Sequence, residues 1–572
     1  MNYNYLEEIN NERLLKCMKM ELMTFSGGYS YNKAVIIAYA MYKMQENPNM
    51  NKTEELLQSL SDKKKIQEIL NDTLSRDWDI VEKFKNEFTK DELLAFILFE
   101  PEKKYLSRTN KISSGISKLA LKLLDIKEDE TCLELCSGTG SFMLNAFRYT
   151  PMSNYMGIES MMDDYAIALL RADVIGKEVF LKLDDALDYE SDEKADKLFS
   201  NYPFGFKRFS LRDQALKLEQ KLNINDRSLE HASSDWVFNA KLVEQLKQGG
   251  KAIAIMSNGS AWNTGDRRIR RFFVNNKYIE AVIALPEYLL CGIRSGVTLV
   301  VFSYDNQSIR FVDASKEYKI ADRRYELTDE NIDTILHYLS VDTEYSTTKT
   351  IEEVVEHDYS FSVINYTAEK VEFKNKTKFR NVANINRGVQ LRANEIDKYK
   401  TEEATSYKFI TLANVNDGYL STEENCQYLT KIPEKWESYC VKNNSLLISK
   451  LGSSTFKSAV VNLKDNETLV VAGNFFIIEL EEDKIDPFYL QAFLMSDLGV
   501  NALNHIKSGT HIYTMSIDRL SNMDIPLPSL EVQKKIGKVY KDTVEELIVL
   551  NKQLEKNKNK LNAIFEEEGG NQ

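Results

Sequence analysis

The chain has 572 residues, which is too many for one hydrophobic core and indicates roughly two to four domains. Its 43% hydrophobic and 28% charged residues are ordinary for a globular protein, and nine prolines without a low-complexity tract argue against long disordered segments. The net charge of −13 excludes a protein that is basic all over, so any contact with nucleic acid would depend on local basic stripes.

The sequence shows no sign of secretion, membrane insertion or metal binding. No stretch approaches the roughly twenty consecutive apolar residues of a membrane span. The amino terminus lacks the basic segment and apolar run of a signal peptide. The six cysteines have neither CxxC spacing nor a histidine at metal-site spacing. We therefore expect a protein of the reducing cytoplasm, with no metal and no membrane partner.

Residues 1–105 are predicted to form a helical domain. Apolar residues recur there at three-to-four spacing between Lys- and Glu-rich faces, as at Val35, Ala38 and Met41. A nuclease domain would show a strand-flanked pair of acids followed by Glu-x-Lys. Residues 102–104 match the Glu-x-Lys part, but the segment lacks the rest of the motif. We therefore expect no nuclease in this chain.

Residues 106–345 alternate between apolar strand candidates and amphipathic helices, which is typical of an α/β domain with a parallel, doubly wound, Rossmann-like sheet. The strand candidates are residues 131–136, 155–159, 179–183, 197–200, 252–256, 280–284 and 298–303. Residues 346–372 are charged and poor in turn signals, and we predict that they form a connector.

The last third of the chain changes in character. Residues 373–530 contain short β-rich runs and are predicted to form a separate α+β domain. Residues 531–568 are predicted to be one long helix with an apolar four-three repeat. The repeat consists of Ile536, Tyr540, Thr543, Leu547, Leu550, Leu554, Asn557, Leu561 and Ile564. A seam of this length predicts a coiled coil with a partner helix, and the alternative is a helix packed on its own domain.

A possible cofactor motif lies at residues 131–142, Thr-Cys-Leu-Glu-Leu-Cys-Ser-Gly-Thr-Gly-Ser-Phe. An apolar strand that runs into a Gly-x-Gly turn presents backbone N–H groups at the carboxyl edge of a sheet, where nucleotide-like cofactors bind. The cofactor-binding candidates in this motif are Glu134, Cys136, Gly138, Thr139, Gly140 and Phe142.

Acids end the next two strand candidates. Glu159 ends the second, where an acid that binds ribose hydroxyls is expected in sheets of this type. Asp185 follows the third and is a candidate for binding an adenine amine. The pattern does not distinguish Asp185 from Asp184 in this role.

Residues 200–205, Ser-Asn-Tyr-Pro-Phe-Gly, directly follow the fourth strand candidate. Two oxygen acceptors that grip the N–H groups of an exocyclic base amine would take up charge as a methyl group arrives. We assign these acceptors to the Asn201 side chain and the Tyr202 backbone carbonyl. Pro203 stiffens the loop, and Phe204 would stack on a base swung out of the duplex. The two motifs together predict an S-adenosylmethionine-dependent methyltransferase that acts on a base amine.

On these motifs the chain resembles the modification subunits of type I restriction systems, which are adenine-N6 DNA methyltransferases. The resemblance extends through residues 234–238, 246–252, 279–286 and 292–298 and covers roughly residues 1–345. It implies S-adenosylmethionine as cofactor, double-stranded DNA as substrate, and a cofactor lid at Thr109. The family's catalytic loop usually reads Asn-Pro-Pro-Phe or Asn-Pro-Pro-Tyr, whereas this chain has Tyr202 at the first proline.

The carboxyl-terminal third resembles half of a type I specificity subunit, with one target-recognition domain at 373–530 followed by one long helix. The matching residues are 382–388, 508–510 and 525–536. Because only one half is present, the resemblance implies that two such chains pair through residues 536–564. Any DNA cleavage would then come from a separate restriction subunit.

Two basic stripes are candidates for contacts with DNA phosphates, with a solvated surface as the alternative for each. The first comprises Arg267, Arg268, Arg270 and Arg271, and the second Lys374, Lys376, Lys378, Arg380, Arg387 and Arg392. Two other functions remain open for the whole chain. One is methylation of cytosine N4, and the other is a methyltransferase-fold protein that binds specific DNA with weak catalysis.

Overall fold

The structure is a computed structural model, and its description covers residues 6, 9, 31–47, 53–60, 63–99, 113–206, 208–290, 293–321, 324–367, 372–389, 393–416, 418–423, 426–452, 456–507 and 513–567. The chain forms two compact units, Met1–Val363 and Ile364–Gln572. Thr109, Arg392 and residues 508–510 lie outside the described residues. Within the described ranges, no helix is both long and apolar enough to cross a membrane.

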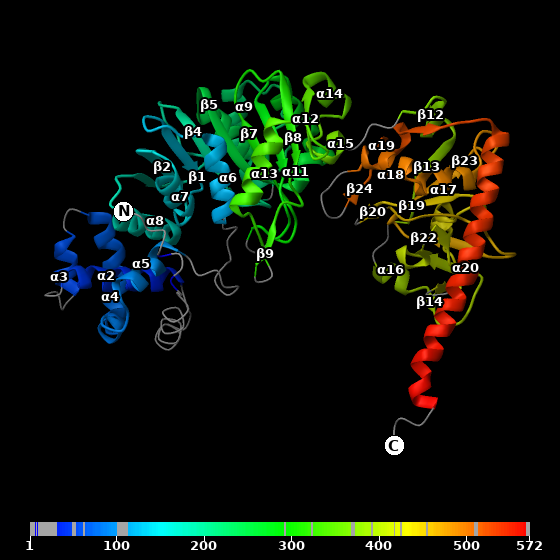
Figure 1. The fold of residues 1–572 in the computed structure, drawn as a ribbon, viewed down its shortest axis with the longest axis horizontal. Coiled ribbons are helices and arrows are strands. Elements are labelled where there is room, and N and C mark those ends of the chain that lie inside the picture. The colour runs from blue at the N-terminus through cyan, green and yellow to red at the C-terminus, as the bar shows by residue number, and fades with distance from the viewer. Residues whose placement is uncertain are drawn as a thin grey trace. The chain divides into compact units, whose positions relative to one another are not determined.

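From residue 31, the described part of the first unit has helices that pack on the following sheet domain (Figure 1). Their bounds are α2 Tyr31–Glu46, α3 Thr53–Ser59, α4 Lys64–Phe84 and α5 Lys90–Leu98. Their apolar side chains share one core with Ile167 and Leu170 of α8 (Met162–Ile175). The Asp173 carboxylate of α8 also accepts a hydrogen bond from the Tyr39 hydroxyl at 2.6 Å. Apolar and polar contacts therefore join these helices to the sheet domain.

A nine-stranded sheet in the order β11-β8-β6-β7-β5-β4-β1-β2-β3 forms the centre of the first unit (Figure 1). Its strands are β1 Thr131–Leu135, β2 Asn154–Glu159, β3 Phe180–Leu183, β4 Ala195–Ser200, β5 Leu246–Ser257, β6 Ile279–Ala284, β7 Val297–Phe302, β8 Ser308–Asp313 and β11 Ser346–Thr350. The predicted α/β class is confirmed, but the sheet is not wholly parallel. β7 runs antiparallel to β5 and β6, because no crossover helix is present in the described part of the β6–β7 link.

Helices cover both faces of this sheet. α6 (Ser114–Leu124), α7 (Ser141–Tyr149), α8 and α13 (Asp329–Ser340) share a core with Ile253 and Ile255 of β5. α10 (Ser234–Gln245) packs on the opposite face. Its Asn239 contacts Met256, and Met256 points to the face opposite to Ile253 and Ile255, because successive side chains of a strand point to opposite faces. The other elements are η2 Arg208–Leu211, α9 Arg212–Leu222, α11 Asn258–Trp262, η3 Thr264–Asp266, α12 Arg267–Asn275, β9 Lys319–Ala321, β10 Arg324–Glu326 and α14 Ile351–Glu356.

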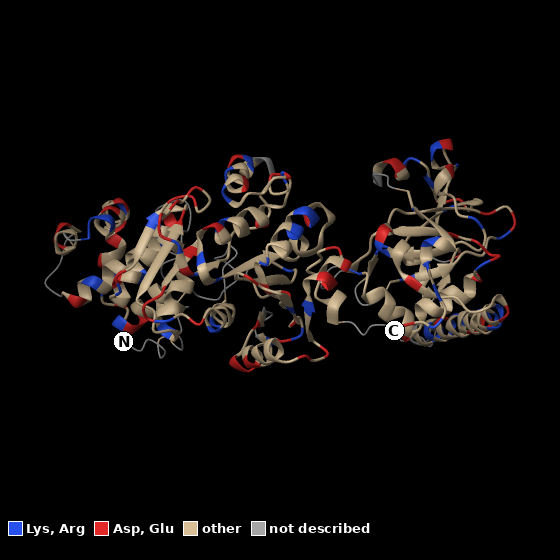
Figure 2. Cartoon of the chain, turned by 90° about the horizontal axis from the view of Figure 1, so that it is seen from above, with Lys and Arg blue, Asp and Glu red and all other residues tan. Residues whose placement is uncertain are grey.

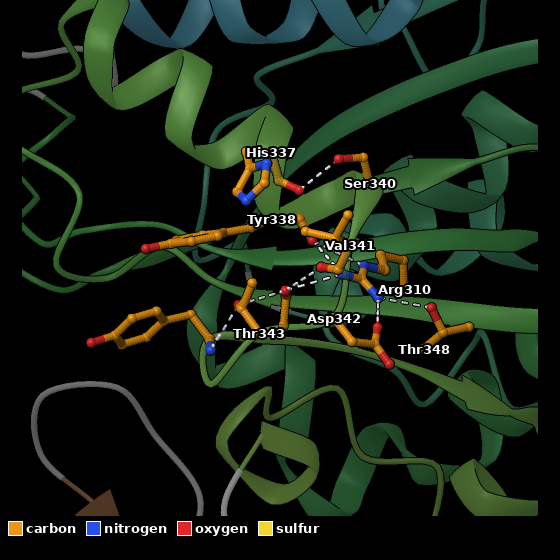
Figure 3. A network of polar contacts seen from close by, with 10 residues as sticks. Arg310, His337, Tyr338, Ser340, Val341, Asp342, Thr343 and Thr348 are labelled. Atoms are coloured by element: carbon orange, nitrogen blue, oxygen red, sulfur yellow. Dashed lines mark hydrogen bonds and ion pairs between the residues drawn. The ribbon is translucent and has the colours of Figure 1, made fainter.

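One arginine of β8 holds the edge strand β11 and the end of α13, as Figure 3 shows. The Arg310 guanidinium donates to the Tyr338 carbonyl at 3.1 Å and to the Thr348 hydroxyl at 2.9 Å, and it forms an ion pair with Asp342. β11 pairs antiparallel with β8, so residues 346–350 belong to the sheet rather than to a connector. The sequence suggested a connector because an edge strand with one solvent-facing side carries few apolar residues.

The second unit is built around two four-stranded sheets, β13-β23-β19-β21 and β14-β18-β15-β22, with smaller pairs β12-β25, β16-β17 and β20-β24. Its strands are β12 Lys376–Lys378, β13 Ala383–Arg387, β14 Lys400–Thr401, β15 Tyr407–Ile410, β16 Val415–Asn416, β17 Tyr419–Leu420, β18 Gln427–Leu429, β19 Leu446–Ser449, β20 Leu451–Gly452, β21 Ser458–Val460, β22 Thr468–Val471, β23 Phe475–Leu480, β24 Tyr513–Thr514 and β25 Asp524–Pro526. Its shorter helices are α15 Ile364–Thr367, η4 Phe379–Asn381, α16 Ala393–Asp397, η5 Leu412–Asn414, η6 Glu434–Tyr439, α17 Pro487–Met495, α18 Asp497–Asn504 and α19 Ile517–Asn522.

The chain ends in the long helix α20 (Leu530–Glu567), whose first turns pack on the rest of the second unit. The Gln533 amide is buried and donates to the Pro528 carbonyl at 2.8 Å. A Cβ on Gly537 would overlap the Asp486 carboxylate. Tyr540 is half-buried beside Gly418. One face of the first turns is therefore occupied by the helix's own domain.

Further along α20, the apolar positions of the predicted seam are exposed. Leu547, Leu550, Leu554 and Leu561 have exposed fractions of 42%, 51%, 52% and 68%. The side chain of Ile564 lies outside the described residues. Within the predicted seam, Tyr540 thus faces its own domain, whereas the leucines from Leu547 onward are available to a partner helix.

Candidate active site

Strands β1, β2 and β4 are neighbours and run parallel, so their carboxyl ends meet at one edge of the sheet. The glycine turn follows β1, and the loop at residues 201–204 follows β4. The Ser200 hydroxyl donates to the Leu135 carbonyl at 2.7 Å, which fastens the end of β4 to the end of β1. The fold therefore brings together the two motifs that the sequence predicts to act together.

The turn after β1 depends on two glycines in the left-handed region, Gly138 at φ +54° and Gly140 at φ +78°. A Cβ on Gly140 would lie 2.9 Å from the Met143 methyl carbon and 3.3 Å from the Ala168 Cβ. A Cβ on Gly138 would meet nothing within 4 Å. Gly140 is also the N-cap of α7, whose first N–H groups have no partner within the helix. The turn thus offers open space and backbone donors at the sheet edge.

Glu159, at the end of β2, holds this turn in place. Its carboxylate accepts backbone N–H groups from Gly138 and from Met161, each at 2.7 Å. Burial raises the pKa of Glu159, and the net shift stays upward although these two hydrogen bonds lower it. The structure therefore places the predicted ribose-binding acid in direct contact with the predicted glycine turn.

The two aspartates after β3 differ in their surroundings. Asp184 is half-buried and forms an ion pair with Lys182 at 2.6 Å. Asp185 is exposed, and its carboxylate accepts the Leu187 N–H at 2.8 Å. Burial raises the pKa of the Cys136 thiol, and the charges of Glu159 and Asp185 raise it further. Asp185 stays the predicted adenine-binding acid, with Asp184 as the alternative.

Two of the predicted cofactor residues lie inside the protein. The Glu134 side chain is buried and accepts a hydrogen bond from the Tyr155 hydroxyl, and burial raises the pKa of its carboxyl group. The Phe142 ring is buried and stacks on Phe199 at a centroid distance of 4.1 Å. The assignment of these two residues to the cofactor site stays a prediction. Both support β1 and α7 from within, because their positions in the motif point into the core.

The predicted catalytic loop lies at the same edge, directly after β4. Asn201 and Phe204 are half-buried and Pro203 is exposed. Phe206 adds a second aromatic ring with 45% of its surface exposed, which the sequence analysis did not single out. The loop thus presents an amide and aromatic surface to one edge of the sheet.

The Tyr202 side chain turns away from this edge. It is fully buried, its ring stacks on Phe238 at 4.9 Å, and its hydroxyl donates to the Asn239 side-chain oxygen at 2.9 Å. Burial, followed by the charge of Asp235, raises the pKa of this phenol well above its ordinary value, so it stays protonated. Because the side chain is buried, only the backbone of Tyr202 is available at this edge. Its carbonyl is the group that the sequence predicts to accept an amine N–H.

A buried arginine on α8 contacts the glycine turn from behind. The Arg171 guanidinium donates to the Thr139 carbonyl at 2.9 Å and to the Ile97 carbonyl of α5 at 2.8 Å. It is fully buried. Arg171 therefore links the turn to the amino-terminal helices. No local pattern in the sequence marks this residue, because it lies 32 positions from Thr139.

The first basic stripe is not one continuous surface. Arg270 is buried and donates to the carbonyls of Tyr359, Ser260 and Asn263 at 2.7, 3.2 and 2.9 Å, so its prediction as a DNA contact is wrong. The helical period of α12 turns this residue toward the core. Arg267, Arg268 and Arg271 are exposed. Arg267 pairs with Asp358, and Arg271 pairs with Asp226 at 3.0 Å.

The second basic stripe is also partly balanced by local partners. Lys378 and Lys376 pair with Asp524 at 2.7 and 2.9 Å. Arg380 donates to the Asn522 side-chain oxygen at 2.6 Å, and Arg387 is exposed on β13. Figure 2 shows basic and acidic residues interleaved in both units. The exposed residues of both stripes, among them Arg268 and Arg387, stay predicted contacts for DNA phosphates.

Comparison with known families identifies both parts of the chain. Residues 113–375 match the family described as N-6 DNA Methylase, and residues 371–559 match the Type I restriction modification DNA specificity domain. The chain joins an N-6 DNA methylase domain to a type I specificity domain. The resemblance drawn from its motifs is thereby confirmed.

Individual relatives are more distant. The Type I restriction enzyme MjaVIII methylase subunit of Methanocaldococcus jannaschii is 25% identical over 282 residues, which is 44% of this chain and 48% of that protein. The chain spans about half the length of the curated relatives it matches. A type I methyltransferase subunit from Streptococcus thermophilus has 15% identity over 62% of this chain and 99% of its own, with a TM-score of 0.45.

Proposed function

We propose that this chain transfers a methyl group from S-adenosylmethionine to N6 of adenine in double-stranded DNA. It would act as the modification and specificity component of a type I restriction-modification or related defence system. The proposal is carried by the position of residues 201–204 at the sheet edge that also holds the glycine turn, within the segment that matches the N-6 DNA methylase family. The same match supports adenine N6 rather than the alternative, cytosine N4.

The residues at this edge fit S-adenosylmethionine. The turn at Gly138 has open space where a side chain would otherwise stand, which suits a bulky ligand close to the backbone. Glu159 uses two of its roughly four acceptor positions on backbone N–H groups, so acceptors remain for ribose hydroxyls. Asp185 would accept from the adenine amine. When bound, the cofactor supplies an electrophilic methyl group.

The loop residues would make the target amine reactive. The lone pair of an exocyclic amine is delocalised into the base, so the nitrogen is a poor nucleophile. The Asn201 side-chain oxygen and the Tyr202 carbonyl would accept its two N–H groups, draw the nitrogen toward tetrahedral geometry and stabilise the positive charge. The nitrogen would form its bond to the methyl carbon as the carbon–sulfur bond breaks, with S-adenosylhomocysteine as the leaving group, and would then release one proton to water. Phe204 would stack on the base, which must leave the duplex to be reached.

The second unit would select the DNA sequence. Its match to the type I specificity domain supports a role in reading base edges, with basic residues on phosphates. The exposed leucines of α20 support pairing of two copies, each of which supplies one recognition domain. A DNA substrate would place the protein in the cytoplasm, and cleavage would require a separate restriction subunit.

Transfer of labelled methyl groups from S-adenosylmethionine to mixed-sequence duplex DNA tests the proposal, with modified bases mapped by long-read sequencing. We expect N6-methyladenine within one sequence motif. Asn201→Ala should lose about 100-fold or more in rate, because one preorganised acceptor is removed. The exposed Asn275 on α12 provides a matched control, so Asn275→Ala should keep the parental rate. Equal transfer by the parent and Asn201→Ala would contradict the assignment of this site.

A further inference from the structure

The hydrogen bond between Tyr202 and Asn239 joins the catalytic loop to the helix behind it. The phenol donates to the Asn239 side-chain oxygen at 2.9 Å, and both side chains are fully buried. The Tyr202 ring also stacks on Phe238 at 4.9 Å, with 13° between the ring planes. A buried ring that is both stacked and hydrogen-bonded has one orientation open to it. The Cα atom from which the loop continues is thereby fixed.

The Asn239 amide is itself held in one orientation. Its nitrogen lies 3.5 Å from the Met256 sulfur, which leaves its oxygen toward the phenol. The helix that carries it, α10, is fastened to the end of β5 by its first turn. The Asp235 carboxylate accepts from the Ser257 N–H at 2.8 Å and from the Ser257 hydroxyl at 2.6 Å. The contact of Tyr202 with α10 is therefore a contact with a rigid part of the sheet domain.

We infer that Asn239 is a positioning residue for methyl transfer. Through the Tyr202 phenol it fixes the loop so that the Tyr202 carbonyl and the Asn201 amide both face the target nitrogen. This inference rests on the proposed function. It also gives a physical reason why tyrosine can stand at position 202, where the family usually has proline. A proline ring limits backbone rotation by itself, whereas Tyr202 has a free φ and is held through its side chain. Pro203 restricts the remaining torsion, because a residue before proline favours extended conformations.

A comparison of four proteins distinguishes a positioning role of Asn239 from a purely structural one. They are the parent, Tyr202→Phe, Asn239→Leu and the double variant. Each single variant leaves one buried polar group without its partner, so both should unfold at lower temperature than the parent. The double variant removes both polar groups and should regain most of the lost stability. If the hydrogen bond positions the loop, the double variant stays slow although it is stable again.

The measurement is the single-turnover rate of methyl transfer at saturating S-adenosylmethionine and duplex DNA, together with the KM for each. We expect about a tenfold fall in rate for both single variants and for the double variant, with each KM within twofold of the parent. Tyr304→Phe is the matched control, because the Tyr304 hydroxyl donates to the Leu246 carbonyl at 2.8 Å at the other end of α10. It should lower stability and leave the rate unchanged.

A parental rate in Tyr202→Phe, or recovery of the rate with stability in the double variant, overturns the positioning role and leaves the proposed function intact when Asn201→Ala is inactive. A parent protein that transfers no more label than Asn201→Ala overturns the proposed function, and the inference falls with it.

Discussion

The Glu159 carboxylate accepts the backbone N–H of Gly138 at 2.7 Å, so the acid that ends β2 holds the turn that follows β1. The contact is possible because the two strands are adjacent and parallel, which brings their carboxyl ends to the same edge. Glu159 therefore shapes the glycine turn and also offers free acceptor positions to a ligand. A change in the charge of Glu159 should therefore alter the conformation of the turn and the binding of the ligand together.

Binding of S-adenosylmethionine should weaken on acidification because of Glu159. Burial raises the pKa of this carboxyl, so it takes up a proton at a higher pH than an ordinary glutamate, whose pKa is about 4.3. The protonated form accepts hydrogen bonds from the Gly138 N–H and from ribose hydroxyls more weakly, because it has lost its negative charge. We expect the dissociation constant, measured by calorimetry, to rise as the pH falls from 7.5 toward 5.

Two variants test whether Glu159 is the group responsible. Glu159→Gln should bind S-adenosylmethionine about tenfold more weakly at pH 7.5, and its affinity should be flat over the same pH range. Asp163→Asn removes an exposed acid from the first turn of α8 and should behave like the parent. A pH dependence that persists in Glu159→Gln would assign the effect to another group.

The sheet edge could be predicted from sequence because its signals are local. Alternating strands and helices, the Gly-x-Gly turn and residues 201–204 each occupy a short stretch, and parallel strands bring their carboxyl ends together. The prediction for Arg270 is wrong because four arginines in five positions resemble an exposed stripe. The three-to-four spacing that places Arg270 beside Phe273 and Val274 was the signal that could have corrected it.

Other features had no local signal. Asn239 lies 37 positions from Tyr202, and only the packing of α10 behind β4 brings their side chains together. Arg171 reaches the glycine turn from a different helix. The strand β11 lacks the apolar run by which strands are recognised, since its outer edge faces solvent. Such contacts follow from tertiary packing, which a single sequence does not display.

Asp173 should make the first unit sensitive to acid. Burial alone would raise the pKa of this carboxyl, but hydrogen bonds from Lys63, Tyr39 and Lys43 outweigh burial and lower it. Its contribution to stability is therefore complete above the unfolded pKa of about 3.9 and is lost as the pH falls through the lower folded value. Asp173→Asn should lose about 3 kcal/mol at pH 7 and show a flatter loss of stability below pH 4 in urea unfolding. An unchanged acid profile would contradict the assignment.

Arg268 and Arg270 should respond differently to removal, although they are two positions apart. Arg270→Ala removes a buried side chain and its hydrogen bonds to three carbonyl oxygens, of which that of Ser260 keeps another donor, the Trp236 indole, and it should lower the free energy of unfolding by about 3 kcal/mol. Arg268→Ala should change stability by less than about 0.5 kcal/mol, because the side chain is exposed. If Arg268 contacts a phosphate, its loss should lower DNA affinity and reduce the slope of log K against log salt by about one unit. Equal stability of the two variants would contradict the buried role of Arg270.

The exposed leucines of α20 should mediate pairing of two copies. Leu550 and Leu554 are about half exposed and lie on the predicted seam. Burial of the exposed half of each leucine contributes about 1 kcal/mol, and a pair of copies carries four such leucines, so Leu550→Glu with Leu554→Glu should weaken dimerisation by about 1,000-fold, before repulsion between the new charges is counted. Light scattering at micromolar protein should then give the mass of a single chain. Val549→Glu is the matched control, because this residue is 55% exposed but lies off the seam, and it should leave the dimer intact. A monomeric parent, or a dimer that survives the double substitution, would show that the pairing surface lies elsewhere.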